Sequence, residues 1–432
     1  MNAPRRLARY SCRFDGFTKN ERSPPVKGYE QGWETCLSRG VPRTLEEMGS
    51  YLGSKVISPP DSKLLKVAIV GVPNCGKSTL INSLMGWRVC SVSSKVHTTE
   101  CNARCVQTID STQIIYLDTP GLVTPEETQR HNLKRTLLVD GEKSLQYADM
   151  MLVVHDVSNH HTRNTLHPRV IRLLALNSQL PSILVLNKVD ILKSKRHLLD
   201  ATRFLTEGIV GGEAINIDKK QIKSLSKENL LRRAIAEKNK EENINSSSGE
   251  KSEFEIEDMT IDTVNNNDIR NGLGHLSERQ ISEFVADHNG WPNFNDVFMI
   301  SAQNGLGVDD LGDYLLDNAK PSPWIFSHTV VTDQNPHDIA IQTVREKFLD
   351  TLPKEMPYNL KFELEYWDLS QSEVLNIVIG IKCKRRSTAR VVMGPHGARV
   401  RQVARESEQD LRNTFRTEVR LRLNVNHTEK KK

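Results

Sequence analysis

The stretch that most constrains this chain of 432 residues is the loop at residues 71–78, which reads GVPNCGKS. It fits the phosphate-binding pattern G-x-x-x-x-G-K-[ST], in which a glycine-rich loop joins a strand to a helix. An apolar run of strand length precedes it at residues 64–70, and residues 79–85 can continue as a helix. Loop N–H groups and the positive end of that helix would then face phosphate oxygens. The sequence therefore predicts a nucleotide-binding loop.

Residues around this loop supply the groups that phosphate chemistry needs. Lys77 would bring a point charge to the β- and γ-phosphates, and the Ser78 hydroxyl suits Mg²⁺. Asp118 follows the apolar run 114–117 and can hold Mg²⁺ through water, while the N–H of Gly121 can face the γ-phosphate. Thr99 lies between Ser78 and Asp118 in sequence, where a first switch segment would supply a second hydroxyl, and Thr98 is the alternative. We therefore predict the metal ligands Ser78, Thr99 and Asp118, and the catalytic set Lys77, Asn74, Thr99 and Gly121.

Two further motifs favour guanine as the base. NKVD at residues 187–190 follows the apolar run 183–186, and a carboxylate at Asp190 can accept from N1–H and from the 2-amino group of guanine. Adenine lacks that donor pair, so a buried Asp190 would reject ATP. SAQ at residues 301–303 follows the run 297–300, and its backbone can meet the guanine oxygen. The predicted GTP-binding residues are Gly71, Val72, Pro73, Asn74, Cys75, Gly76, Lys77, Ser78, Thr79, Asp118, Thr119, Pro120, Gly121, Leu122, Asn187, Lys188, Asp190, Ser301, Ala302 and Gln303.

The residue after the D-T-P-G stretch bears on the rate of hydrolysis. Many GTPases carry a glutamine there that orients the attacking water, but this chain has Leu122, which cannot do so by hydrogen bonding. We therefore expect slow hydrolysis unless another group contributes. The side-chain oxygen of Asn74 can hold a monovalent cation against the phosphates, so such a cation is a candidate cofactor beside Mg²⁺ and GTP/GDP.

Three other side chains near these motifs each have a functional and an ordinary interpretation. His97 is either a catalytic base or, as we favour, an ordinary loop histidine. Cys75 is either a redox brake on nucleotide binding or, as we favour, a small residue that fills space in the loop. Cys101 and Cys105 are four residues apart, but no further cluster of His or Cys completes a zinc site.

The N-terminal stretch differs in composition from the rest. Its first 14 residues contain Arg5, Arg6, Arg9 and Arg13 and no acidic residue. This is typical of a mitochondrial presequence, and a disordered basic tail is the alternative. We predict a leader over residues 1–45 and a linker over 46–62, with one short helix at 44–52. The sequence contains no run of about 18 apolar residues, so it predicts no membrane span.

The middle of the chain reads as alternating apolar strands and helices. This pattern predicts an α/β P-loop GTPase domain over residues 63–325, with a doubly wound, mostly parallel sheet. It is interrupted at residues 218–285 by a charged, Asn- and Ser-containing insertion that we expect to be largely disordered. We favour a solvated surface loop over a partner-docking arm for this insertion. Residues 227–242 can form a charged helix.

The C-terminal end is strongly basic. Residues 384–432 hold 14 Lys and Arg against 5 Asp and Glu, so a polyanionic partner is expected. We predict a helix at 338–351, strands at 360–367 and 373–382, a long helix at 398–415 and a last strand at 418–425, with a basic tail at 428–432. Before the long helix lies GPHG at residues 394–397, a G-x-x-G turn that allows a nucleic-acid backbone to approach closely. The predicted RNA-binding residues are Gly394, Pro395, His396, Gly397, Arg390, Arg399 and Arg401.

The arginines have a plainer interpretation, since Arg399, Arg401 and Arg405 could be a solvated helix face.

Taken together, the motifs GVPNCGKS, DTPGL, NKVD and SAQ resemble the TrmE–Era–EngA group of GTPases. The element order after residue 336 resembles an α+β KH domain of the bacterial type II topology. A GTPase domain followed by a KH domain resembles the Era family, over roughly residues 64–217 and 290–427. The family switch usually reads T-T-R, whereas this chain has Glu100 in place of the arginine.

The resemblance implies a partner and a location. An Era-like protein with a mitochondrial leader would act in the matrix, as a monomer, on the 3′ region of mitochondrial small-subunit rRNA and on the assembling small subunit. Potassium-stimulated hydrolysis and peripheral association with the inner membrane are part of the same expectation. One alternative is a GTPase of tRNA modification, against which the KH ending and the missing C-terminal cysteine signature argue. The other is a non-enzymatic, nucleotide-gated RNA-binding protein, which Leu122 makes conceivable.

Overall fold

The structure is a computed structural model that describes residues 40–92, 103–118, 145–215, 285, 287–353 and 356–427. The chain divides into compact units at residues 1–38 and 39–432, so the described residues all belong to the second unit. Several predictions lie outside them: the leader up to residue 39, nearly all of the insertion with its charged helix, the basic tail, and His97, Thr99 and residues 119–122.

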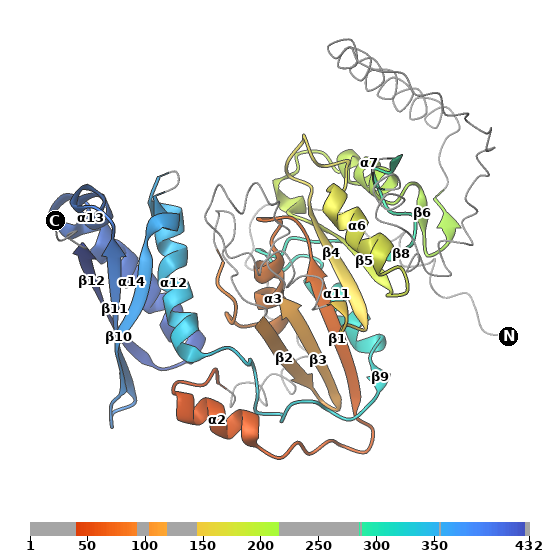
Figure 1. Ribbon diagram of the computed structural model, residues 1–432. Helices are drawn as coiled ribbons and strands as arrows, with labels where there is room; N and C mark the ends of the chain where they lie inside the picture. The colour runs from red at the N-terminus through yellow and green to blue at the C-terminus, as the bar shows by residue number, and fades with distance from the viewer. Residues whose placement is uncertain are drawn as a thin grey trace, which may run out of the picture. The chain divides into compact units, whose positions relative to one another are not determined.

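The largest sheet has the strand order β2-β3-β1-β4-β5-β8, with the short β9 beside β1 (Figure 1). β1 is parallel to β3 and β4, β4 to β5, and β5 to β8, while β2 is antiparallel to β3. The predicted mostly parallel α/β sheet is therefore confirmed. The strands are β1 Lys63–Val70, β2 Ala103–Ile109, β3 Thr112–Asp118, β4 Met150–Asp156, β5 Ser182–Asn187, β8 Phe294–Met299 and β9 Lys320–Pro321.

Helices cover both faces of this sheet because side chains alternate along each strand. On β1, Val67 and Ile69 belong to the apolar cluster of α3 (Lys77–Met85) and α11 (Val308–Asp317). Ala68 and Val70 belong to the opposite cluster, with α6 (Pro168–Leu176) and α7 (Arg196–Leu205). Burial on both faces explains why β5 is buried at every residue. Short elements β6 Ile209–Val210, β7 Glu213–Ala214 and the 3₁₀ turn η2 Val189–Ile191 complete this half.

The C-terminal half is an α+β unit with a three-stranded sheet ordered β10-β11-β12. β10 is antiparallel and β12 parallel to the central β11. The predicted helix at 398–415 is found with those bounds, and the other predicted elements begin and end within two residues of the observed ones. The elements are α12 Pro336–Thr351, η4 Pro357–Asn359, β10 Lys361–Leu369, β11 Val374–Cys383, α13 Arg386–Met393, η5 Pro395–Gly397, α14 Ala398–Phe415 and β12 Glu418–His427.

The segment before β1 also packs on the C-terminal half. The short predicted helix is present as α2 (Leu45–Gly53), and the Thr44 hydroxyl caps it by accepting from the N–H of Glu47. Just before it, the carbonyl of Arg43 accepts a hydrogen bond from Trp367 Nε1 of β10 at 2.9 Å. Val41 is buried in the same region of the core. None of the helices that the structure describes is long and apolar enough to span a membrane.

Candidate functional site

The phosphate loop is shaped by backbone that passes very close to neighbouring strands. β1 ends at Val70 and α3 begins at Lys77, so the loop joins a strand to a helix N-terminus as predicted. Gly76 has a φ of 101°, and a Cβ there would lie 2.2 Å from Asn187 Nδ2. A Cβ on Gly71 would lie 2.5 Å from the carbonyl oxygen of Val154. These positions therefore require glycine, which keeps the loop amides against the carboxyl ends of the strands.

Lys77 and two of the three predicted metal ligands, Ser78 and Asp118, lie where the loop meets α3. Lys77 is 6% exposed, and its Nζ donates to the carbonyls of Gly71 and Val72 at 3.2 and 3.1 Å. Ser78 Oγ donates to Asp118 Oδ2 at 2.9 Å, so β3 brings its last residue to the start of α3. A hydroxyl and a carboxylate in contact form an oxygen donor set that suits Mg²⁺. The structure thus brings together two of the three predicted metal ligands.

Asn187 works as a clamp between two loops. Its Nδ2 donates to the carbonyl of Cys75 at 2.8 Å, and its Oδ1 accepts from the N–H of Ala302 at 3.0 Å. Asn187 is 2% exposed, so these bonds lie in the interior. The residue therefore fixes the distance between the phosphate loop and the SAQ loop. The motif predicted that Asn187 lies at the site, but nothing in the sequence indicated this bridging role.

Lys188 is anchored by a residue that the sequence analysis missed. Its Nζ donates to the carbonyl of Asn74 at 2.8 Å and to Asp156 Oδ2 at 2.6 Å. Burial favours a higher pKa for the Asp156 carboxyl, but hydrogen bonds from Lys188 and Ser158 outweigh it and hold that pKa below its usual value. Asp156 ends β4 at the same edge of the sheet as Asp118 and Asn187. Its position after the apolar run 150–154 was the signal available in the sequence.

The base-selecting residues are more open than expected. Asp190 is exposed, whereas the sequence argument invoked a buried carboxylate. Asn304 Nδ2 donates to Asp190 Oδ2 at 3.3 Å, and sequence analysis did not single out Asn304. Ser301 and Ala302 are buried and Gln303 is exposed, so this loop presents its third residue to solvent.

Cys75 fits the ordinary interpretation. It is fully buried within the loop, and burial raises the pKa of its thiol, which disfavours the reactive thiolate. Among the described residues, no cluster of three or more His, Cys, Asp or Glu could hold a metal ion. Cys101 lies outside the described residues, so the interpretation of the Cys101 and Cys105 pair stays a prediction. Thr99, Thr119, Pro120, Gly121, Leu122 and His97 lie outside the described residues, so their roles stay predictions.

The G-x-x-G turn is a separate feature at the N-terminus of α14. Gly394, His396 and Gly397 have φ of 70°, 49° and 73°, a run of left-handed backbone. A Cβ on Gly394 would lie 2.8 Å from Arg399 Cβ, whereas one on Gly397 would have nothing nearer than 3.6 Å. Pro395 and His396 are exposed. The turn therefore presents its middle residues and its backbone to solvent.

The predicted RNA-binding arginines divide into two kinds. Arg390 and Arg401 are exposed beside the turn. Arg399 is half-buried, and its guanidinium donates to the carbonyl of Val391 at the end of α13. Arg399 therefore braces the turn itself, while Arg390 and Arg401 remain available to a polyanion.

Comparison with known proteins agrees with both halves. The family model described as "50S ribosome-binding GTPase" matches residues 66–188. The chain is 42% identical over 367 residues to "GTPase Era, mitochondrial" of Danio rerio, covering 85% of this chain and 76% of the relative. It is 31% identical to "GTPase Era, mitochondrial" of Caenorhabditis elegans, covering 86% of this chain and 91% of the relative.

A solved structure is similar across the same range. It is titled "Crystal structure of Era in complex with MgGDPNP and nucleotides 1506-1542 of 16S ribosomal RNA". The TM-score is 0.57 and the identity is 22%, with 85% of this chain and 94% of that chain covered. This likeness supports the fold, a P-loop GTPase domain followed by a KH domain.

Proposed function

This chain belongs to the Era family of GTPases, and from that premise we propose that it is a mitochondrial RNA chaperone for the small ribosomal subunit. It binds and hydrolyses GTP, grips the 3′ region of mitochondrial small-subunit rRNA through its KH domain, and supports assembly of that subunit. The observation that carries this proposal is the presence, on one chain, of a braced guanine-nucleotide site and an exposed G-x-x-G turn flanked by Arg390 and Arg401.

Printed names of similar proteins support the compartment and the RNA class. Relatives with 42% and 31% identity are named mitochondrial, and the similar solved Era is bound to a fragment of 16S ribosomal RNA. The acid-free, Arg-bearing start of this chain agrees with import into the matrix. A monomeric state and peripheral contact with the inner membrane rest on the family resemblance.

The chain's own residues divide the work at the nucleotide. Lys77 would bring its charge to the β- and γ-phosphates, and the N–H groups of the loop would face them. Ser78, Asp118 and Thr99 would hold Mg²⁺, which when bound neutralises charge on the phosphate oxygens. Asp190 accepts from the guanine edge, and Asn187 keeps the phosphate loop and the SAQ loop at a fixed spacing. The nucleotide then biases the state that binds RNA, and hydrolysis resets it.

Potassium has a specific place in this proposal. Asn74 lies in the phosphate loop with a φ of 63°, and its carbonyl is held by Lys188. We propose that its side-chain oxygen holds K⁺ against the phosphates and so compensates for Leu122. GTP turnover should be faster in KCl than in NaCl, and Asn74→Ala should remove the difference. Turnover at the uncatalysed background in both salts would instead favour the non-enzymatic alternative.

The experiment that tests the RNA target is crosslinking in cells. The tagged protein is crosslinked by ultraviolet light and its bound RNA is sequenced, beside a variant with Gly394→Asp and Gly397→Asp. We expect reads on the 3′ end of mitochondrial small-subunit rRNA that the variant lacks. Reads on cytosolic rRNA would contradict the compartment, and reads mainly on tRNA would favour the tRNA-modification alternative.

A further inference from the structure

The segment between α3 and Val92 lies against the KH domain. Trp87 is 8% exposed, and its Nε1 donates to the carbonyls of Asn413 and Thr414 at 3.2 and 3.1 Å. These carbonyls belong to the last turn of α14, where no N–H group within the helix can donate to them. The guanidinium of Arg416 lies 3.5 Å from the centre of the Trp87 ring. The indole thus joins the end of α14 to the GTPase domain.

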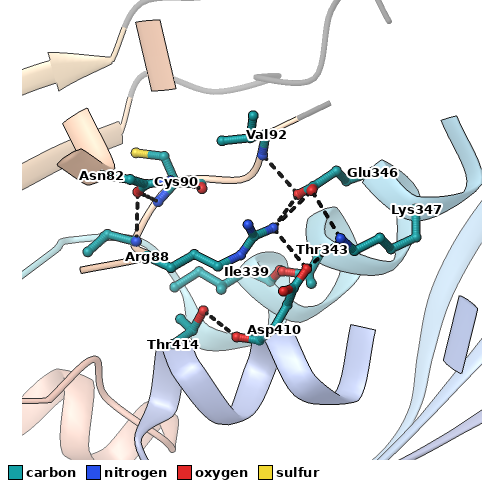
Figure 2. A network of polar contacts seen from close by, with 11 residues as sticks. Asn82, Arg88, Cys90, Val92, Ile339, Thr343, Glu346, Lys347, Asp410 and Thr414 are labelled. Atoms are coloured by element: carbon teal, nitrogen blue, oxygen red, sulfur yellow. Dashed lines mark hydrogen bonds and ion pairs between the residues drawn. The ribbon is translucent and has the colours of Figure 1, made fainter. Parts of the chain in front are cut away.

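A partly buried group of charged side chains continues this contact (Figure 2). Arg88 Nη2 donates to both carboxylate oxygens of Glu346, at 2.9 and 2.7 Å, and lies 3.2 Å from Asp410. Lys347 Nζ lies 2.7 Å from Asp410 and 3.7 Å from Glu346. The N–H of Val92 also donates to Glu346, at 2.8 Å. One carboxylate of α12 therefore holds both a side chain and the backbone of the segment 87–92.

Glu346 is the central member of this group. Its side chain is 3% exposed, and burial raises the pKa of its carboxyl, although Arg88 and the Val92 N–H act in the opposite direction. Removing Glu346 would leave the Val92 N–H without its acceptor and would leave two cations, Arg88 and Lys347, beside the single carboxylate of Asp410, which is destabilising in a partly buried site. The contact is also apolar, because Leu84 of α3, Ile339 of α12 and Phe415 of α14 belong to a single buried cluster.

A cleft joins this contact to the predicted guanine-nucleotide site. Its volume is about 690 Å³, and Thr79, Ala302 and Gln303 line it from the nucleotide site. Trp87, Arg88 and Val92 line it as well, and Asn413 and Arg416 line it from the KH domain. The wall that faces the predicted base-binding loop is therefore built in part by residues that Glu346 holds in place.

We propose that Glu346, a residue of the RNA-binding domain, is a positioning residue of the nucleotide site. It fixes Arg88 and the backbone at Val92 along one wall of the cleft, so that the affinity for guanine nucleotides depends on the KH domain. The inference rests on the proposed function in one respect, that GTP binds at residues 71–78. Because Asn74 and Lys77, the described members of the predicted catalytic set, do not line this cleft, loss of Glu346 affects the binding of nucleotide and leaves the chemical step largely intact.

The test uses the full chain and two measurements. Titration with a fluorescent GDP analogue gives Kd, and steady-state GTP hydrolysis gives KM and kcat separately. For Glu346→Ala we expect Kd and KM to rise about tenfold, equal to 1.4 kcal/mol, with kcat changed by less than about twofold. Glu346→Gln keeps an acceptor for the Val92 N–H, so it should recover part of the loss. Partial unfolding would instead lower the active fraction and kcat while leaving KM unchanged.

Controls keep the outcome decisive. Glu406→Gln repeats the change made in Glu346→Gln, but at an exposed position of α14, and it should leave Kd unaltered. If Glu346→Ala does not fold, Arg88→Lys keeps the charge but loses the two-pronged contact, and Kd should rise about threefold. An unchanged Kd in the folded Glu346 variant, or in Arg88→Lys, would overturn the inference. RNA crosslinking of the unaltered chain is scored separately, so a wrong RNA target would leave this result standing.

Discussion

The phosphate loop and the G-x-x-G turn both place left-handed backbone just before a helix, but their surroundings differ. The phosphate loop is bonded to its neighbours through Asn187 and Lys188, which reach it from the end of β5. The G-x-x-G turn is held by Arg399 from the next helical turn and otherwise faces solvent. The first site is therefore a network of distant segments, and the second is a local structure.

This difference has consequences for how each site fails. In the network, one substitution leaves several buried groups without partners, so its effects spread to the other loops. In the local turn, the effect of a substitution should depend on the backbone conformation and on how closely an RNA backbone can approach. It should not reach the nucleotide site. The following experiments examine that contrast, beginning with the largest expected effect.

The largest effect is expected from Lys77→Ala. Lys77 is 6% exposed and its ammonium donates to the carbonyls of Gly71 and Val72, so alanine removes the buried cation of the loop. Affinity for GTP, measured by calorimetric titration, should fall by at least about 100-fold. Lys63→Ala, at the exposed start of β1, is the matched control and should change it little. Unchanged GTP affinity in Lys77→Ala would refute the assignment of the phosphate loop.

Substitutions in the G-x-x-G turn should lower the affinity for RNA and leave the nucleotide site unaffected. Gly394→Asp with Gly397→Asp should reduce affinity for a single-stranded RNA by at least about 30-fold, with unchanged GTP turnover. The single alanine variants sharpen this contrast, because Gly394→Ala would bring Cβ to 2.8 Å from Arg399, whereas Gly397→Ala would meet no atom nearer than 3.6 Å. Gly394→Ala should therefore be the more harmful of the two in fluorescence anisotropy. Retained RNA affinity in the double variant would contradict the KH assignment.

Asp190→Asn tests an exposed part of the network. Exchange of the carboxylate for an amide removes an acceptor for guanine and provides a donor for the extra oxygen of xanthine. GTP affinity should fall about tenfold, and affinity for xanthosine triphosphate should rise. Competition titrations with the two nucleotides measure this directly. Asp310→Asn, an exposed position of α11, serves as control. An unaltered preference would remove Asp190 from the base-selecting role.

Sequence alone was sufficient where one local pattern decides one element. The period of the apolar residues located α14, and G-x-x-x-x-G-K-S located the junction of β1 with α3. It was insufficient where a side chain bridges segments far apart in the chain. Asp156 and Lys188 are 32 residues apart, and Arg88 and Glu346 are 258 apart. Only the folded sheet and the packed domains bring such partners together.

The smallest effect concerns the Asp156–Lys188 pair, which only the fold revealed. Since the pKa of Asp156 is lowered in the folded chain, the pair stabilises the protein above the ordinary carboxyl pKa of about 4. That stability is lost as the pH falls through the lower, folded pKa. Because the Asp156 side chain is 19% exposed, the pair should contribute about 1 kcal/mol.

Thermal unfolding of the unaltered chain should therefore show a larger loss of stability between pH 6 and about 3 than thermal unfolding of Asp156→Asn. Parallel curves for the two proteins would mean that Lys188 is held by the carbonyl of Asn74 alone, and that this corner of the network is less interdependent than the rest.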